Sequence, residues 1–149
     1  MRPLGYDARS KQLFYMNELR YCTSGVFLLG TDAWYVNGSY APGMYCSNVL
    51  MLPAEMKTSQ GFSIYEQDIL ILKDREKGEE KIGIVQIIHD GFHLTPTDTR
   101  SDSEYFAISF REIASNKNLE VTRIGNRYTT PWYLGKDFNS CIYVFKPKV

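Results

Sequence analysis

Two carboxylates lie close together in the middle of the chain, in the segment SIYEQDILIL at residues 63–72. Glu66 and Asp68 are separated by one residue and stand directly before four consecutive aliphatic residues. If a strand has already begun at Glu66, its period of two places both acids on one face. Paired acids of this kind perform general acid–base catalysis or bind hard cations. We prefer the alternative that Asp68 ends a turn and the aliphatic residues enter the core, because the sequence offers no third ligand or base near by.

The two histidines of the chain form a second candidate site, in the segment HDGFH. His89 and His93 are four residues apart, which is the spacing of two zinc ligands on one helix face. Asp90 and Gly91 between them are a favoured hairpin pair, so we expect the two rings on opposing strands. A catalytic zinc site needs a third protein ligand and an open position. We therefore predict no metal site.

Other signatures of enzymes are absent from the sequence. It has no Walker loop, no G-x-G-x-x-G turn after a strand and no G-x-S-x-G nucleophile motif. We therefore predict no catalytic residues and no cofactor. The sequence favours a protein that is not an enzyme, but it leaves the enzyme alternative open.

Charge and cysteine content restrict the partners and the compartment. The 17 basic and 17 acidic side chains cancel, whereas nucleic-acid binders usually carry a basic excess and a neutral chain tolerates self-association. Cys22, Cys46 and Cys141 are widely spaced and odd in number, which favours reduced, buried thiols over disulfides. No apolar run approaches the roughly 20 residues of a membrane helix, and the start of the chain does not resemble a signal peptide. We expect a cytoplasmic protein that does not bind a membrane and is able to form homo-oligomers.

Short strands separated by turns dominate the pattern along the chain. Apolar runs alternate with polar turns, and no segment keeps helical spacing over three turns. The expected strands are residues 13–16, 25–30, 33–36, 49–52, 68–72, 105–110, 119–126 and 141–145, together with a hairpin over 82–96 that turns at Asp90-Gly91. We expect Pro53 to end the strand before it, and the mixed-charge segment around Gly78 to form a solvated hairpin connection. The helix candidates are PAEMKTSQ at 53–60 and FREIASNK at 110–117.

This pattern predicts a mainly β fold with a small barrel or a sandwich-like core and a loop-rich N-terminal part. The length of 149 residues corresponds to a single domain. Within it we expect two subparts, with a seam at the turn near residues 53–62.

An aromatic-rich segment is the main candidate for a binding surface. Residues 37–48 have the composition of a long loop, and loops of this length are uncommon without a function. Trp34, Tyr35, Tyr40 and Tyr45 lie in or near it. Such aromatics form stacking platforms for single-stranded nucleic acid or anchor subunit contacts. The neutral charge makes us favour the subunit contact.

Three stretches, in this order, resemble the YopX family of phage and prophage proteins: RPLGYDARSKQLFYM, SIYEQDILIL and LEVTRIGNRYTTPWYL. Members of the family typically begin with Arg-x-x-x-aromatic-Asp, continue with Tyr-Glu-Gly-Asp-Ile/Val and close on Ile-Gly-Asn-x-Tyr-x-x-Pro. The residues that match are Arg2, Tyr6, Asp7, Tyr65, Glu66, Asp68, Ile69, Ile124, Gly125, Asn126, Tyr128 and Pro131. The resemblance spans residues 2 to about 134, and residues 20–58 match little.

One position departs from the family pattern. Gln67 stands where the family usually has glycine. If that glycine serves a turn with positive φ, Gln67 is strained there.

The resemblance implies a β-rich protein of the bacterial cytoplasm, encoded by a phage or prophage, and it brings no catalytic residue with it. It also implies a structural signature in which the acids cap turn amides. The residues of that signature are Tyr65, Glu66, Asp68, Gly125, Asn126 and Tyr128.

Three functions follow as hypotheses. The first is a non-enzymatic accessory protein that acts as a binding or assembly module. The second is a small metal-dependent hydrolase or nuclease-like enzyme that uses Glu66, Asp68 and a histidine. The third is a single-stranded nucleic-acid-binding protein with a local surface such as Arg123, Arg127 and Tyr128. A nucleic-acid partner is the least expected of these because the chain is neutral.

Overall fold

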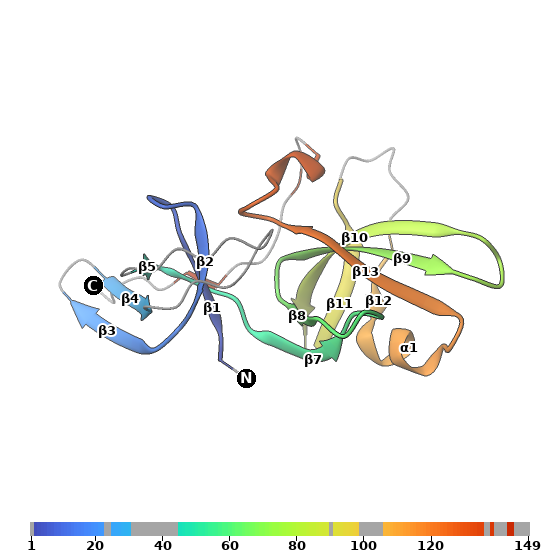
Figure 1. The fold of residues 1–149 in the computed structure, drawn as a ribbon, viewed down its shortest axis with the longest axis horizontal. Helices are drawn as coiled ribbons and strands as arrows, with labels where there is room; N and C mark the ends of the chain where they lie inside the picture. Colours follow the sequence, from blue (N-terminus) through green and yellow to red (C-terminus); the bar gives the residue numbers. More distant parts are fainter. Residues whose placement is uncertain are drawn as a thin grey trace. The chain divides into compact units, whose positions relative to one another are not determined.

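The computed structural model describes residues 2–22, 25–30, 45–89, 91–98, 106–135, 138 and 143–144. The chain splits into two compact units, one of Met1–Pro53 with Ile142–Val149 and the other of Ala54–Cys141 (Figure 1). The division falls between Pro53 and Ala54, at the start of the range in which the sequence predicts a seam. None of the described helices is long and apolar enough to cross a membrane.

The first unit consists of short antiparallel strands. Its strands are β1 (Leu4–Asp7), β2 (Gln12–Tyr15), β3 (Glu18–Cys22), β4 (Gly25–Gly30), β5 (Tyr45–Ser47), β6 (Val49–Leu50) and β14 (Tyr143–Val144). β1 and β2 form a hairpin, β3, β4 and β5 form a three-stranded sheet in that order, and β6 pairs with β14. The core of this unit contains Phe14, Leu28 and Tyr45. The rings of Phe14 and Tyr45 stack with their centroids 5.7 Å apart.

The second unit is built on a five-stranded antiparallel sheet. Its elements are β7 (Pro53–Lys57), β8 (Ser63–Tyr65), β9 (Asp68–Asp74), β10 (Glu80–Ile88), β11 (Gly91–Pro96), β12 (Ile108–Ser109), α1 (Phe110–Ser115), β13 (Leu119–Asn126) and the 3-10 helix Pro131–Tyr133. The sheet has the order β12-β11-β10-β9-β13, and β7 pairs with β8 beside it (Figure 1).

The core of the second unit lies on one face of this sheet. Alternate residues of β9, Leu70 and Leu72, point to the face that also carries Val85, Leu94 and Val121 of the neighbouring strands. A second layer closes this face with side chains of β7, β8 and α1, namely Ala54, Ile64, Phe110 and Ile113. The mainly β prediction is confirmed. The described sheets are open, and the two-layer core of this unit is that of a sandwich.

Most predicted strands and turns are found where the sequence placed them. The strands expected at 25–30 and 119–126 are β4 and β13, and the strand expected at 68–72 is β9, which continues to Asp74. The mixed-charge segment joins β9 to β10, with Gly78 at φ 71°. The helix expected from residue 110 is α1, and Glu112 N donates to the hydroxyl of its N-cap Ser109 at 3.1 Å.

The strand expected at 49–52 is β6, which ends at Leu50, before Pro53. Pro53 itself begins β7, and the first position of a strand tolerates proline because no N–H is needed there for the sheet. One prediction about residues 53–60 is wrong. The segment PAEMKTSQ is not a helix, because Pro53–Lys57 pairs with β8 and buries Ala54 in the core. A helix of this length gains little by itself, so tertiary pairing decides its structure.

Three further boundaries differ from the prediction. The aromatic strand expected at 105–110 is described only as Ile108–Ser109, because Ser109 caps α1 and Phe110 already belongs to the helix. The turn of the β10–β11 hairpin precedes the predicted pair by one residue, since Gly91 is paired with Ile88 and His89 adopts φ 56°. The C-terminal end of the loop predicted at 37–48 is strand β5.

Candidate functional site

The two predicted carboxylates lie at the turn between β8 and β9. Glu66 and Gln67 form the turn, and the strand begins at Asp68, as in the preferred interpretation that Asp68 ends a turn and the aliphatic residues after it enter the core. The alternative that both acids share one strand face does not hold, because Glu66 lies before the strand. Both acids are buried, with exposed fractions of 1% for Glu66 and 0% for Asp68. They therefore do not face solvent as a substrate-binding pair would.

Backbone hydrogen bonds on both sides hold Gln67 in the turn. Its N–H donates to Val85 O of β10 at 2.8 Å, and its carbonyl accepts the N–H of Arg127 at 2.9 Å. Gln67 adopts φ 74°, which is the left-handed region where glycine is favoured. The position at which the family resemblance implies glycine is thus one that requires positive φ. The fully buried Gln67 bears a backbone cost of roughly 1 kcal/mol there.

Asp68 and Asn126 form the centre of the buried polar cluster. Asp68 Oδ2 accepts the backbone N–H of Tyr65 at 2.9 Å, and Asp68 Oδ1 accepts Nδ2 of Asn126 at 3.0 Å. Asn126 Oδ1 in turn accepts the N–H of Tyr128 at 3.0 Å. One carboxylate and one amide therefore fix the β8–β9 turn and the turn after β13 to each other.

A β-bulge in β13 produces this pairing. Arg123 lies opposite Leu70, but after the shift Gly125 lies opposite Ile69 and Asn126 lies opposite Asp68. Without the extra residue, Gly125, which has no side chain, would stand opposite Asp68. A bulge redirects side chains in this way at the end of a strand.

Gly125 is required for close packing next to the bulge. A Cβ atom built on Gly125 would overlap the hydroxyl of Thr130 and lie 2.9 Å from Thr130 Cβ. That hydroxyl accepts the N–H of Asn126 at 2.9 Å and donates to Asn126 O at 3.0 Å. The Gly125-Asn126 pair thus combines a close backbone approach with the amide that binds Asp68.

The charges around Asp68 have opposing effects. Burial raises the pKa of Asp68 to about 6, although the positive charge of Arg123 and the hydrogen bonds from Asn126 and Tyr65 lower it. Burial lowers the pKa of Arg123, and the charge of Asp68 partly offsets this. At neutral pH the folded protein therefore holds a buried, mostly ionised carboxylate near a guanidinium.

Tyr128 and Arg127 lie beside this cluster. Burial raises the pKa of Tyr128 to about 12, the charge of Arg127 lowers it, and the charge of Glu66 raises it further. The guanidinium carbon of Arg127 lies 5.8 Å from the Tyr128 ring centroid and 5.3 Å from that of Phe138. Both residues are half-buried. Two of the side chains that the sequence suggested as a nucleic-acid surface therefore make part of their contacts within the second unit.

The histidines do not join the carboxylates. His93 lies opposite Gln86 in the β10–β11 hairpin, and its Nδ1 atom is 3.0 Å from Gly91 O. His89 lies in the turn of that hairpin. Within the described part of the chain, no three or more His, Cys, Asp or Glu side chains are grouped so that they could hold a metal ion. Asp68 accepts the backbone N–H of Tyr65 and the side-chain amide of Asn126, and Glu66 is buried in the turn before it.

A second buried acid serves the first unit in a similar way. Asp7 Oδ1 accepts the N–H groups of Arg9 and Ser10 at 2.9 and 3.0 Å, and Oδ2 accepts the N–H of Cys46 at 3.0 Å. Burial alone raises the pKa of Asp7, but the bonds from Cys46, Ser10 and Arg9, with the charge of Arg9, bring it below its ordinary value. The residue patterns alone did not indicate that Asp7 joins the β1–β2 turn to β5.

The aromatic surface predicted from the sequence is only partly within the described residues. Trp34, Tyr35 and Tyr40 lie outside them. Tyr45 is a core residue with an exposed fraction of 4%, so its assignment to a binding surface is corrected. Its ring packs on Phe14 because β5 pairs with β4, which brings it into the apolar centre of the first unit.

A cavity lies elsewhere in the second unit. It has a volume of about 380 Å³, and its lining includes the apolar residues Leu72, Leu119 and Ile108. Charged residues of the β9–β10 connection and of α1, such as Lys77 and Glu112, also line it. No residue of the predicted signature lines it.

Comparisons with family models, with curated proteins and with solved structures gave no match to this chain.

Proposed function

We propose that the protein is a non-enzymatic binding or assembly module. The resemblance to the YopX family supports a role as an accessory protein encoded by a phage or prophage and located in the bacterial cytoplasm. The proposal also takes account of the neutral net charge, which permits self-association.

The observation that carries this proposal is the state of Asp68. Both of its oxygens accept hydrogen bonds from within the chain, and its exposed fraction is 0%. A general acid or base must come within hydrogen-bond reach of the substrate proton that it moves. A carboxylate enclosed in this way supports a structural role, in which it stabilises two turns.

A metal titration tests the proposal against the metal-dependent hydrolase. We expect that Mg²⁺, Mn²⁺ and Zn²⁺ leave the thermal midpoint of the full chain unchanged, because a ligand that binds only the folded state would raise it. Differential scanning fluorimetry measures this for the wild type, for Glu66→Ala and for the matched control Glu79→Ala, whose acid is exposed. A metal-dependent rise that disappears in Glu66→Ala and persists in Glu79→Ala would contradict the proposal.

A further inference from the structure

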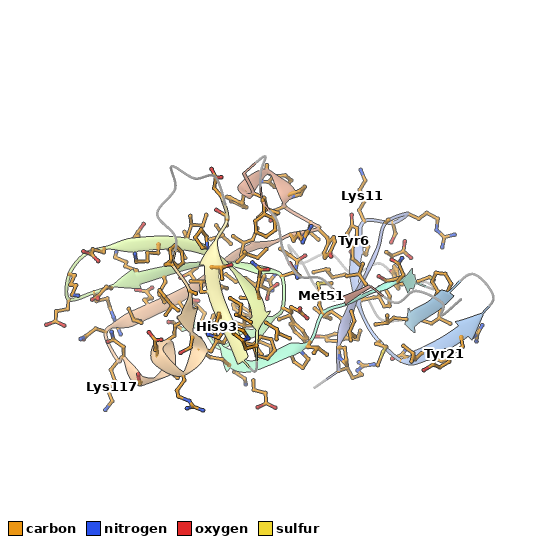
Figure 2. All side chains as sticks on the ribbon, turned by 180° about the vertical axis from the view of Figure 1, so that it is seen from behind. Tyr6, Lys11, Tyr21, Met51, His93 and Lys117 are labelled. Atoms are coloured by element: carbon orange, nitrogen blue, oxygen red, sulfur yellow. The ribbon has the colours of Figure 1, made fainter. Side chains whose placement is uncertain are left out.

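Strand β3 is an edge strand of the described three-stranded sheet in the first unit. In the sheet β3-β4-β5 it pairs only with β4 among the described strands (Figure 1). Every side chain from Glu18 to Tyr21 is exposed, and Tyr21, labelled in Figure 2, reaches an exposed fraction of 76%. Edge strands present unpaired N–H and C=O groups, and proteins usually protect them with Lys, Pro or bulges. The segment ELRYC contains no Lys or Pro.

The two faces of β3 carry different chemistry. Leu19 and Tyr21 are two residues apart and therefore lie on the same face, and Leu19 is 37% exposed. Glu18 and Arg20 alternate on the other face, where Glu18 Oε1 lies 3.0 Å from an Arg20 guanidinium nitrogen. The strand therefore offers an exposed apolar face and a second face with one charge of each sign.

We propose that β3 binds β3 of a second copy of this chain as an antiparallel pair centred on Leu19. A two-fold axis normal to the joined sheet pairs residues that point to the same face. Within β3 this condition allows a register centred on any of its five residues. The registers centred on Glu18 and on Arg20 place that residue against its own copy, and like charges directly opposite are destabilising. The registers centred on Tyr21 and on Cys22 place neither charged residue opposite a charged residue of β3.

The register centred on Leu19 is the one that places opposite charges against each other. It places Glu18 opposite Arg20 of the second copy, and this pair occurs twice because of the symmetry. The same register brings Leu19 against Leu19 of the second copy, so that both exposed apolar side chains gain cover. Charge complementarity therefore identifies a second copy, and not an arbitrary extended peptide, as the occupant of this edge.

This inference rests on the assembly role proposed above and names its partner and its contact. The experiment measures the mass of the full chain by sedimentation velocity over a range of concentrations. We expect the mass of two chains for the wild type. Arg20→Glu and Glu18→Arg each place like charges opposite each other at both pairs, so each variant alone should have the mass of one chain.

A mixture of Arg20→Glu and Glu18→Arg provides the decisive experiment. In a mixed pair, the two acids of one chain lie opposite the two arginines of the other, so the mass of two chains should return. The matched control Arg111→Glu changes an exposed charge of α1 and should leave the wild-type mass unchanged. Far-UV circular dichroism verifies that every variant is folded, and the two single variants serve as independent tests if one of them does not fold.

Three outcomes would overturn the inference: a wild type that stays monomeric, a dimer that tolerates Arg20→Glu, or a mixture that stays monomeric. A dimer that tolerates Arg20→Glu would place the subunit contact elsewhere and leave an assembly role standing. The proposal of a non-enzymatic module fails on a different measurement, namely the metal titration with Glu66→Ala.

Discussion

Asp68 lies in an unusual environment for an acid. Its carboxylate is buried, accepts two hydrogen bonds and lies near the charge of Arg123. Burying an ion costs free energy that its partners recover only in part, which is why its pKa lies above the ordinary value. Asp68 has a structural role, because its hydrogen bonds to Tyr65 and Asn126 connect two turns.

The raised pKa of Asp68 predicts a specific pH dependence of stability. The pKa of Asp68 rises from 3.8 to about 6 on folding, so the protonated carboxyl favours the folded state. This stabilisation is fully present below pH 3.8 and is lost as the pH rises through 6. The loss for the wild type is about 3 kcal/mol of unfolding free energy. Asp68→Asn cannot ionise and does not lose this stabilisation. The unfolding free energy of the wild type should therefore fall relative to that of Asp68→Asn as the pH rises through this window.

Urea unfolding of both proteins at intervals between pH 4 and 7 measures this difference. Two curves that run parallel across the window would show that Asp68 is not buried as an acid in the folded protein.

Gln67 allows the cost of its backbone conformation to be isolated. Gln67→Gly and Gln67→Ala both remove the buried side chain, but only glycine adopts φ 74° without steric cost. We expect Gln67→Gly to be more stable than Gln67→Ala by roughly 1 kcal/mol in urea unfolding. Equal stabilities would mean that the turn relaxes to negative φ when the side chain is removed.

At the scale of elements, the bulge in β13 is the feature that creates the cluster. β9 and β13 pair along most of their length, and their alternating residues contribute to the core of the second unit. The single extra residue at the shift between Arg123 and Gly125 changes which side chain stands opposite Asp68. A strand without the bulge would preserve the core but would not form the Asp68–Asn126 hydrogen bond.

Gly125→Ala tests the packing that accompanies the bulge. The added methyl group would overlap the Thr130 side chain, so this turn must shift and the hydrogen bonds of Thr130 to Asn126 must weaken. We expect a loss of about 1–3 kcal/mol in unfolding free energy.

The matched control is Gly91→Ala in β11. A Cβ atom there meets nothing closer than 3.9 Å, so this variant should stay near wild-type stability. Equal effects of the two substitutions would show that close packing at Gly125 is not important.

At the scale of the whole molecule, the two units each have their own apolar core, and the charges of the chain cancel. Binding to nucleic acid draws most of its non-specific affinity from the neutralisation of phosphates. The side chains suggested for such a surface, Arg123, Arg127 and Tyr128, are half-buried and interact within the second unit. We therefore keep a protein partner as our proposal and treat nucleic acid as the alternative to be tested.

Fluorescence anisotropy with labelled single-stranded DNA tests the nucleic-acid alternative. We expect no binding at low salt, because the chain has no excess of positive charge to attract phosphates. Binding at low salt that weakens as salt is added, and that Arg127→Ala abolishes, would instead support a local site. The exposed Trp132, at the 3-10 helix, provides the control Trp132→Ala for aromatic stacking without charge.

The amino-acid sequence alone was sufficient for the fold class and for most strands. Residues 25–30, 69–72 and 119–126 carry local apolar patterns, and turns such as that at Gly78 are marked by residue types that favour them. Local preferences of this kind act over a few residues and can be read directly. Gln67 adopts φ 74°, the conformation that the sequence analysis considered for this position only as a condition.

Only the tertiary structure decided which residues meet. The pairing of Asp68 with Asn126 depends on a one-residue bulge, and the burial of Tyr45 depends on a strand pairing within the first unit. The strand at Pro53–Lys57 likewise exists because β8 provides its hydrogen-bond partner. Register and long-range pairing are set by the packing of the whole core, and the local sequence pattern does not contain them.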